Sequence, residues 1–349
     1  MNPIHLTIGT YTQGSDPDRG IVHATLAADG SSIEAYAVTP FADPSWVVRG
    51  PDGRTFYAVS EATEGGVGSF AGGASDGALR QLSVHPSGGA EPCHATLFNG
   101  GAHLAVANYT SGSLSVHPVG ADGSVGARTC VVQHGGTGPD TDRQAGPHAH
   151  MVTPDPDGRF LLAIDLGNDS IFGYELLAET GVLHEVARSR MRPGFGPRHL
   201  AFHPDGGHAY VIGELGFGVA VCTYDPRRAE FSVLGEVPVL ENGVPGEDFP
   251  SGICVSPDGR FLYAAARGRD TIRVFSLAAG ADRPEIVATV PTGGSWPREI
   301  ALSPDGSLLL SANQHGDSVT VFRLDADTGI PRPTGARLSV PSPTCLVMA

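Results

Sequence analysis

A short unit recurs about every fifty residues in this chain of 349 residues, and the repeat restricts the fold more than any other feature. The clearest copy runs from Gly196 to Gly216 and reads GPRHLAFHPDGGHAYVIGELG. Apolar residues alternate with small or polar ones on both sides of a Pro-Asp-Gly turn, which is the period-2 pattern of a β-hairpin. Proline presets φ within such a turn, and glycine tolerates a positive φ. The segment therefore predicts two antiparallel strands joined by a tight turn.

Each copy of the unit opens with a proline. The opening prolines are Pro44, Pro92, Pro147, Pro197, Pro250, Pro297 and Pro343, spaced by 46 to 55 residues. In five copies the turn begins seven residues after the proline, whereas the third copy, which contains HAHM, has two additional residues before its turn. Repeats of this length are typical of solenoids, propellers and arrays.

Further strand-like segments follow each hairpin, as in GVAVCTYD after the copy described above. About four short strands per copy correspond to one propeller blade. The last copy has room for one strand only, while the chain starts with HLTIGTYT and GIVHATLA, two strands without an opening proline. We therefore predict an all-β, seven-bladed β-propeller with four-stranded antiparallel blades, forming a single domain over residues 1–349. A composite blade of N- and C-terminal strands would close the ring and protect two strand edges.

The charge and the cysteines limit the kinds of partner and compartment. Asp and Glu number 37 against 22 Lys and Arg, a net charge of −15, and this disfavours binding to nucleic acid. No apolar run approaches the roughly 18 residues of a membrane helix, and the N-terminus lacks the basic region of a secretory signal. The five scattered cysteines include no C-x-x-C pair, which predicts small buried thiols in a reducing compartment. We expect a cytoplasmic protein without nucleic-acid or membrane partners.

The repeat brings polar residues from different copies to one end of their hairpins. Residues directly after the opening proline include His148, Arg198 and Arg298; those ten residues after the start of the turn include Glu61, Glu214, Arg267 and Gln314; and those one residue earlier include Asn108. Because the first strand of each blade lines the central channel, we expect all three sets to surround one mouth of it. His94 and His199, one step further along the first strand, are second-rank candidates.

Three arginines at equivalent positions point to an anionic small-molecule substrate. Arginine is always charged and directs two donors toward a carboxylate or a phosphate. In the alternative interpretation, each arginine pairs with a carboxylate such as Glu61 or Glu214. The coincidence of three arginines, a histidine and a glutamate at equivalent offsets favours a substrate site. By contrast, we expect the glycine-rich segment from Gly135 to Ala145 to be an exposed loop.

Metal binding and a serine nucleophile have weaker support. His148 and His150 have the spacing of two metal ligands on one face of a strand. No third ligand stands at suitable spacing, however, and the nearby arginines would repel a cation, so we predict no metal. The one G-x-S-x-G match, from Gly73 to Gly77, falls in a glycine-rich segment that we expect to be a loop rather than a strand-to-helix turn, so a nucleophilic serine has no support.

The repeats also resemble a known family. The runs GPHAHMVTPDPDGRFLLAIDLGNDSI, GPRHLAFHPDGGHAYVIGELG, SGICVSPDGRFLYAAARGRDTI and WPREIALSPDGSLLLSANQ, together with IGTYT near the start, are similar to the seven-bladed propeller lactonases. That family includes bacterial 6-phosphogluconolactonases and fungal carboxymuconate-cyclising enzymes. The resemblance covers the whole chain and implies a site at His148, Arg198, Glu214 and Arg267, with no metal or organic cofactor. Where the family has an Asn-Arg pair, this chain has Ala266 before Arg267, so an amide expected at the rim is missing.

These observations predict hydrolysis of a sugar lactone, with 6-phosphoglucono-1,5-lactone as the first candidate. Arginines 198, 267 and 298 would hold the anionic groups and polarise the ester carbonyl, and His148 or Glu214 would activate water. The residues expected to contact the substrate besides the catalytic set are Arg298, His94, His199, Asn108, Gln314 and Glu61. Two alternatives remain open: a carboxymuconate cyclase that uses the same pocket, and a non-catalytic propeller scaffold.

Overall fold

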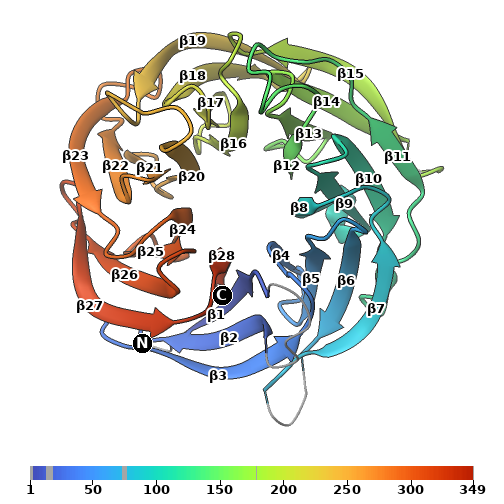
Figure 1. Ribbon diagram of the computed structural model, residues 1–349, viewed down its shortest axis with the longest axis horizontal. Coiled ribbons are helices and arrows are strands. Elements are labelled where there is room, and N and C mark those ends of the chain that lie inside the picture. Colours follow the sequence, from blue (N-terminus) through green and yellow to red (C-terminus); the bar gives the residue numbers. More distant parts are fainter. Residues whose placement is uncertain (1–2, 13–18, 73–76, 178, 349) are drawn as a thin grey trace.

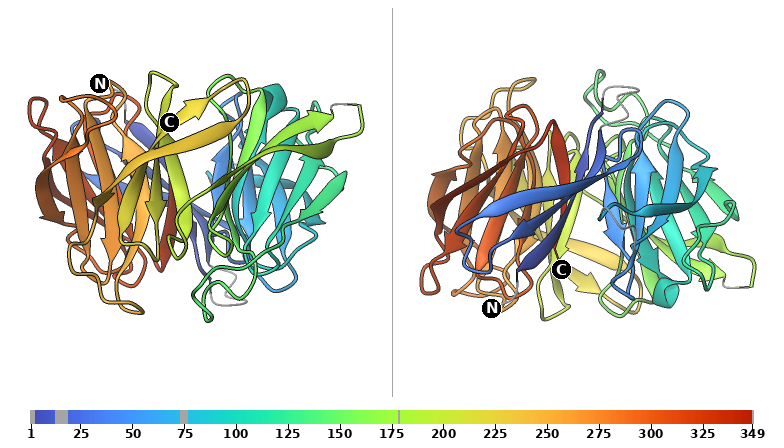
Figure 2. Two further views of the ribbon diagram at one scale, coloured as in Figure 1. Left: turned by 90° about the horizontal axis from the view of Figure 1, so that it is seen from above. Right: turned by 90° about the horizontal axis from the view of Figure 1, so that it is seen from below.

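Seven four-stranded antiparallel sheets stand in a ring around a central channel (Figure 1). The structure, a computed structural model, describes residues 3–12, 19–72, 77–177 and 179–348. In every sheet the strands lie in order from the channel to the periphery, and Figure 2 shows that they run through the thickness of the ring. The predicted seven-bladed propeller is therefore confirmed.

The ring closes through a composite blade, as the sequence predicts. Its strands, from the channel outward, are β28 (Pro343–Met348), β1 (Ile4–Thr10), β2 (Gly20–Leu26) and β3 (Ile33–Pro40). Antiparallel pairing of Ile8 with Leu346 and of Leu6 with Met348 joins the two ends of the chain. The last strand therefore occupies the channel position of a blade whose other strands come from the N-terminal part of the chain.

The other six blades follow one another along the chain. The next three consist of β4 (Val47–Arg49), β5 (Thr55–Ser60), β6 (Gly66–Ala71) and β7 (Arg80–Pro86); β8 (Pro92–Phe98), β9 (His103–Asn108), β10 (Ser113–Pro118) and β11 (Cys130–Gln133); and β12 (Ala149–Pro154), β13 (Phe160–Asp165), β14 (Ser170–Leu177) and β15 (Val182–Arg190). The last three consist of β16 (Pro197–Phe202), β17 (His208–Gly213), β18 (Gly218–Asp225) and β19 (Glu230–Pro238); β20 (Phe249–Val255), β21 (Phe261–Arg267), β22 (Thr271–Ser276) and β23 (Glu285–Pro291); and β24 (Pro297–Leu302), β25 (Leu308–Asn313), β26 (Ser318–Leu324) and β27 (Pro331–Ser339). A short 3-10 helix, η1 (Asn99–Gly101), occupies the turn position of the β8–β9 hairpin.

The turns that connect the first two strands of a blade have the chemistry that their sequences predict. In the β16–β17 turn, Oδ1 of Asp205 accepts the backbone N–H groups of Gly207 at 2.9 Å and of His208 at 3.0 Å. Gly206 has a φ of 70°, a conformation that L side chains rarely adopt. These turns return the chain to the end of the ring from which it came, so the start of each first strand lies beside the end of the second.

Apolar clusters between adjacent blades form the core of the described structure. One of them packs Leu162 and Ile164 of β13 against Val211 of β17, and another packs Leu6 and Ile8 of β1 against blade β24–β27. Such clusters join every pair of neighbouring blades around the ring, including the composite blade and its two neighbours. Burial between blades therefore holds the sheets at fixed positions around the channel.

Candidate active site

Irregularities in the channel strands direct polar side chains toward one mouth of the channel. The pairing register of the first two strands shifts between Pro92 and His94, between Pro197 and His199, and between Pro297 and Glu299. The residue at each shift is Cys93, Arg198 or Arg298, the residue directly after the opening proline. A β-bulge bends its strand locally and re-aims a side chain, and bulges are common next to active sites.

A cavity of about 190 Å³, which we call the inner cavity, lies at this mouth. Its lining residues are Tyr11, Glu61, Glu91, Cys93, Tyr109, Arg143, His150, Glu214, Arg267 and Arg298. Four of these, Glu61, Glu214, Arg267 and Arg298, belong to the set that the repeat offsets predict. The structure thus brings together predicted residues that are up to 237 positions apart in the sequence.

Glu214 is the centre of a buried group of charges. Its Oε2 lies 2.6 Å from Nη2 of Arg267 and 3.3 Å from Nε of Arg198, and its Oε1 lies 2.5 Å from Nη2 of Arg143. Burial raises the pKa of Glu214, but the positive charges of Arg267 and the other two arginines outweigh burial and hold that pKa well below its usual value. Glu214 is therefore ionised, and its carboxylate orients three guanidinium groups.

Arg198 lies behind the lining, with 2 % of its side chain exposed. Its Nη1 donates to the backbone carbonyl of Ser251 at 2.9 Å. Burial, with the neighbouring charges of Arg267 and Arg298, lowers the pKa of Arg198 to about 9, so the guanidinium is still protonated at neutral pH. Its role in the described geometry is to hold Glu214 and to add positive charge beneath the cavity.

Arg298 and Glu61 form a second, looser pair across the inner cavity. The Nη2 of Arg298 lies 3.8 Å from Oε2 of Glu61, and the guanidinium is 5.1 Å from the ring centre of Tyr11. The hydroxyl of Tyr11 donates to Oε1 of Glu61 at 2.7 Å. Within the described structure, Oε2 of Glu61 is buried and has no hydrogen-bond partner. Buried polar atoms are rarely left in this state, so the Arg298–Glu61 side of the cavity has unused capacity for a polar ligand.

The structure places His150, not His148, at the position equivalent to Arg198 and Arg298. The register shift in the third copy lies between Ala149 and Met151, so His150 is the bulged residue. The N–H of Leu166 donates to the carbonyl of His148, just as the N–H of Glu214 donates to that of Gly196. His148 therefore corresponds to the residue before the opening proline. It stacks on Tyr109 with ring centres 4.5 Å apart and does not line the inner cavity.

The two additional residues before the third turn explain this difference. Counted backward from the turn at Pro156, the position equivalent to Arg198 is His150, six residues earlier in both copies. Counted forward from the proline, the same offset selects His148. The turn is the better reference because it sets the register in which the two strands pair. An insertion before the first strand does not change that register.

His94 and His199 lie in a layer beneath the inner cavity. The imidazole of His199 lies 5.4 Å from that of His94 and 5.1 Å from that of His150, and His94 stacks on Trp46 at 4.0 Å between ring centres. Burial lowers the pKa of His94 to about 3, and burial also places the pKa values of His150 and His199 well below the usual value. All three imidazoles are therefore uncharged at neutral pH. His94 and His199 support the cavity without lining it.

Residues nine positions after the start of the turn, one before the positions of Glu61, Glu214 and Arg267, face away from the cavity, contrary to our expectation. Nδ2 of Asn108 donates to Oγ of Ser113 at 3.3 Å within its own blade, and Ala266 packs in the apolar cluster between two blades. Successive side chains of a strand point to opposite faces, so these residues and their neighbours at the rim diverge. A side chain at position 266 would not reach the rim. Gln314 has a buried Oε1 and is likewise not among the lining residues.

Sequence reasoning missed several lining residues for different reasons. Cys93 and Tyr109 stand at the same repeat offsets as Arg198 and Glu214, so the repeat contained their signal. Tyr11 follows the N-terminal strand, and Glu91 precedes an opening proline. Arg143 gave no signal because it comes from the segment expected to be an exposed loop. Its position depends on tertiary contacts of that loop rather than on the repeat.

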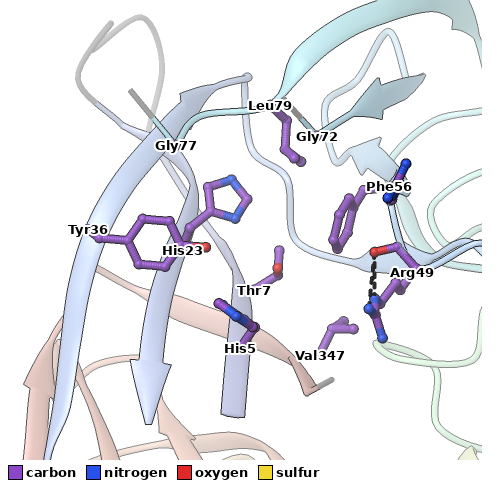
Figure 3. Close-up of a pocket in the computed structure, with 12 residues that line it drawn as sticks. His5, Thr7, His23, Tyr36, Arg49, Phe56, Gly72, Gly77, Leu79 and Val347 are labelled. Atoms are coloured by element: carbon purple, nitrogen blue, oxygen red, sulfur yellow. Dashed lines mark hydrogen bonds between the residues drawn. The ribbon is translucent and has the colours of Figure 1, made fainter. Parts of the chain in front are cut away.

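A cavity of about 460 Å³ between the composite blade and blade β4–β7 has a different character (Figure 3). The rings of His23, Tyr36 and Phe56 line it, and Arg49 lies at its edge. Nε2 of His23 is within 2.9 Å of Oγ1 of Thr39, and Arg49 donates to the carbonyl of Gly53, so these polar groups have local partners. The inner cavity, with buried charges from several blades converging on one volume, is the better candidate for an active site.

Groups of three or more His, Cys, Asp or Glu side chains arranged to hold a metal ion do not occur among the described residues. None of the helices in the described parts of the chain is long and apolar enough to cross a membrane.

Comparison with known proteins places the chain in a family. Residues 5–348 match the model of the family described as "Lactonase, 7-bladed beta-propeller". The 6-phosphogluconolactonase of Bacillus subtilis is 32% identical over 97% of this chain and 96% of its own length, and that of Formosa agariphila is 30% identical over 82% and 83%. A solved structure of the periplasmic gluconolactonase of Pseudomonas aeruginosa superposes with a TM-score of 0.92 at 32% identity, covering 100% of this chain and 99% of that one. The chain belongs to the seven-bladed β-propeller lactonase family.

Proposed function

We propose that this protein hydrolyses a sugar lactone in the inner cavity, with 6-phosphoglucono-1,5-lactone as the first substrate to test. The relatives named above are two 6-phosphogluconolactonases and a gluconolactonase, and both names denote enzymes that open sugar lactones. The observation that carries the proposal is the ion-paired group around Glu214. It fixes guanidinium donors at the wall of a cavity that is large enough for a small molecule.

The charge balance of the inner cavity favours an anion. Arginines 143, 198, 267 and 298 lie in or against it, and the carboxylates that line it are Glu61, Glu91 and Glu214. The lining arginines and carboxylates are equal in number, and the positive charge of Arg198 behind the lining remains. Glu299, which interacts with Arg198 and Arg298, has its pKa raised to about 7 by burial and is only partly ionised at neutral pH. The remaining positive charge would stabilise a substrate phosphate or the oxyanion that develops when water adds to a lactone carbonyl.

The proposed reaction uses His150 as the proton carrier. Water adds to the lactone carbonyl carbon, the uncharged imidazole of His150 takes the proton, and Arg267 and Arg298 stabilise the oxyanion. Collapse of this intermediate breaks the bond to the ring oxygen, which receives the proton from His150 and leaves as a hydroxyl group. Burial, and after it the charges of Arg198 and Arg298, lower the pKa of His150. The growing negative charge offsets the effect of these arginines, so the imidazole becomes a stronger base as the reaction proceeds.

Glu214 is less suited to the role of base in this arrangement. Both of its carboxylate oxygens are in contact with guanidinium groups, which compete with a water molecule for them. We assign it to orienting the arginines. Cyclisation of a carboxymuconate is the weaker alternative because three substrate carboxylates would meet only one unbalanced positive charge.

The direct test is hydrolysis of freshly generated 6-phosphogluconolactone, coupled to 6-phosphogluconate dehydrogenase and compared with spontaneous hydrolysis. We expect a rate well above background, and we expect Arg198→Ala to lower kcat/KM at least about tenfold because charge-assisted hydrogen bonds contribute about 1.5–3 kcal/mol. D-glucono-1,5-lactone and a carboxymuconate are tested in parallel. Conversion of the carboxymuconate alone would replace the lactonase proposal, and no conversion with no anion-induced thermal shift would favour a scaffold.

A further inference from the structure

A second cavity of about 360 Å³, the outer cavity, adjoins the inner one. Arg143 and Glu214 line both, so their ion pair of 2.5 Å is the wall between the two spaces. The same Nη2 of Arg143 also donates to the hydroxyl of Tyr109 at 3.2 Å. About one third of the Arg143 side chain is exposed, so solvent reaches this edge of the boundary between the two cavities.

The loop that carries Arg143 is held in place by buried contacts. Nε2 of Gln144, a fully buried side chain, donates to the carbonyl of Leu166 and to Oδ1 of Asp169, both at 2.8 Å. The backbone N–H of Arg143 donates to Oδ1 of Asp140 at 3.0 Å. These bonds fix the backbone on both sides of Arg143, so the wall is part of the folded structure.

The outer cavity differs from the inner one in charge. Besides Glu214, the carboxylates of Asp140, Asp142 and Asp248 line it, and Arg143 is the arginine among its lining residues. Asp248 is 3 % exposed. Its Oδ2 accepts the backbone N–H of Val244 at 2.9 Å and lies 3.0 Å from Nε of Arg269. Asp248 is thus ion-paired with Arg269, so Asp140 and Asp142 are the carboxylates that make this space negative. A phosphate or a carboxylate would be repelled from this space.

Hydroxyl groups suit the outer cavity because carboxylates accept hydrogen bonds and cannot donate them when ionised. The rings of Phe217 and Phe249 also line it, and the guanidinium groups of Arg143 and Arg267 lie 5.6 Å and 5.4 Å from the centre of the Phe249 ring. Phe217 therefore provides the apolar face against which the C–H groups of a sugar can pack. Carboxylates around aromatic rings, beside a cationic cavity, thus form a site for an uncharged and hydroxyl-rich group.

We propose that the outer cavity is a second binding subsite for an uncharged sugar unit joined to the lactone, with Arg143 marking the boundary between the two units. The proposal rests on the proposed lactonase function and extends its substrate class to glycosylated aldonolactones of disaccharide size. The lactone ring occupies the inner cavity, and the glycosidic bond crosses the exposed edge of Arg143.

The test compares D-glucono-1,5-lactone with maltobiono-1,5-lactone, which carries one additional glucose unit. Asp142→Asn and Phe217→Leu change the outer cavity only, and Asp157→Asn, on an exposed turn remote from the mouth, is the matched control. We expect the wild type to have the higher kcat/KM on the disaccharide lactone. Asp142→Asn and Phe217→Leu should each lower that value at least about fivefold, as for the loss of one hydrogen bond or ring contact. Their effect on gluconolactone should stay below about twofold.

Equal losses on both lactones, or no preference of the wild type for the disaccharide, would overturn the subsite. Failure of the lactonase function itself has a separate signature, since neither lactone would then be hydrolysed above background. In that case, calorimetry with maltobionate and gluconate tests the subsite independently of catalysis. Tighter binding of maltobionate that is lost in Asp142→Asn supports the outer site, and equal or absent binding of both acids refutes it.

Discussion

Glu214 directly follows β17, and Arg267 is the last residue of β21, the second strand of the neighbouring blade. Their side chains, 5 % and 7 % exposed respectively, form an ion pair of 2.6 Å. The pair joins blades β16–β19 and β20–β23 at the channel mouth. It therefore belongs both to the candidate site and to the packing of the ring, so its removal should affect activity and stability together.

Glu214→Gln removes the negative charge from three buried or half-buried guanidinium groups. We expect destabilisation by about 3–5 kcal/mol, the usual cost of breaking a buried ion pair, and a loss of lactonase activity of at least about 100-fold. Urea unfolding and initial rates measure the two effects. The control is Glu175→Gln, which breaks the exposed 3.8 Å pair with Arg159 and should change stability by less than about 0.5 kcal/mol. An active Glu214→Gln enzyme would show that the carboxylate does not organise the site.

His150→Asn and His148→Asn distinguish the two histidines of the HAHM segment. Because His150 lines the inner cavity and His148 does not, we expect His150→Asn to lower kcat by about 100-fold or more. His148→Asn should lower it by less than about fivefold, through loss of stacking on Tyr109. Steady-state kinetics with a thermal melt of each variant provides the comparison. The reverse order of effects would return the catalytic role to His148.

Buried histidines make the fold sensitive to acid. Burial lowers the pKa of His23 to about 4 and that of His94 to about 3, so the unfolded chain binds protons at a higher pH than the native protein does. The stability that these uncharged imidazoles contribute is complete above pH 6.5 and is lost as the pH falls toward 4 and 3. We expect the urea midpoint of the wild type to decrease over this pH range and that of His23→Gln to decrease less steeply. Equal pH dependence of the two midpoints would show that His23 does not contribute to the acid sensitivity.

Glu299 has the opposite pH dependence. Burial raises its pKa to about 7, although the N–H of Leu346 donates to its Oε2 at 2.8 Å. A carboxyl group with a raised pKa contributes stability below its unfolded value near 4.5, and that contribution is lost as the pH rises through 7. Glu299→Gln keeps an acceptor for Leu346 and cannot ionise. We therefore expect it to be more stable than the wild type at pH 8 by a larger margin than at pH 5, as measured by urea unfolding at both values. A margin that does not change with pH would place the ionised form of Glu299 in a well-solvated setting.

The repeat made the fold predictable from sequence. Four of the turns have an aspartate that accepts backbone N–H groups (Asp52, Asp205, Asp258 and Asp305) followed by a glycine at positive φ, and these local interactions set the strand pairing of their hairpins. Seven such units cannot bury their apolar faces singly, so ring closure through β28 and β1 follows from the same pattern. The offsets also predicted that Glu61, Glu214, Arg267 and Arg298 lie at one mouth.

Prediction of the site was incomplete where the determining contacts are not periodic. Arg143 reaches Glu214 because the neighbouring Gln144 is buried against Leu166 and Asp169, so two residues from another part of the chain fix this loop. Asn108 does not line the cavity because the alternation of side chains along β9 directs it toward Ser113 of its own blade. Strand alternation could have shown the orientation of Asn108 from the sequence, whereas the contact of Arg143 could not be read from residue types at repeat offsets.

The sequence by itself determined the number of blades, the closure of the ring and the end at which polar groups gather, because hairpin turns and alternating patterns act over a few residues. The tertiary structure decided which carboxylate the arginines share and which loop residue divides the two cavities. These depend on Coulomb interactions between blades at Glu214 and on the buried anchor of Arg143. Such interactions arise only when distant parts of the chain are brought together.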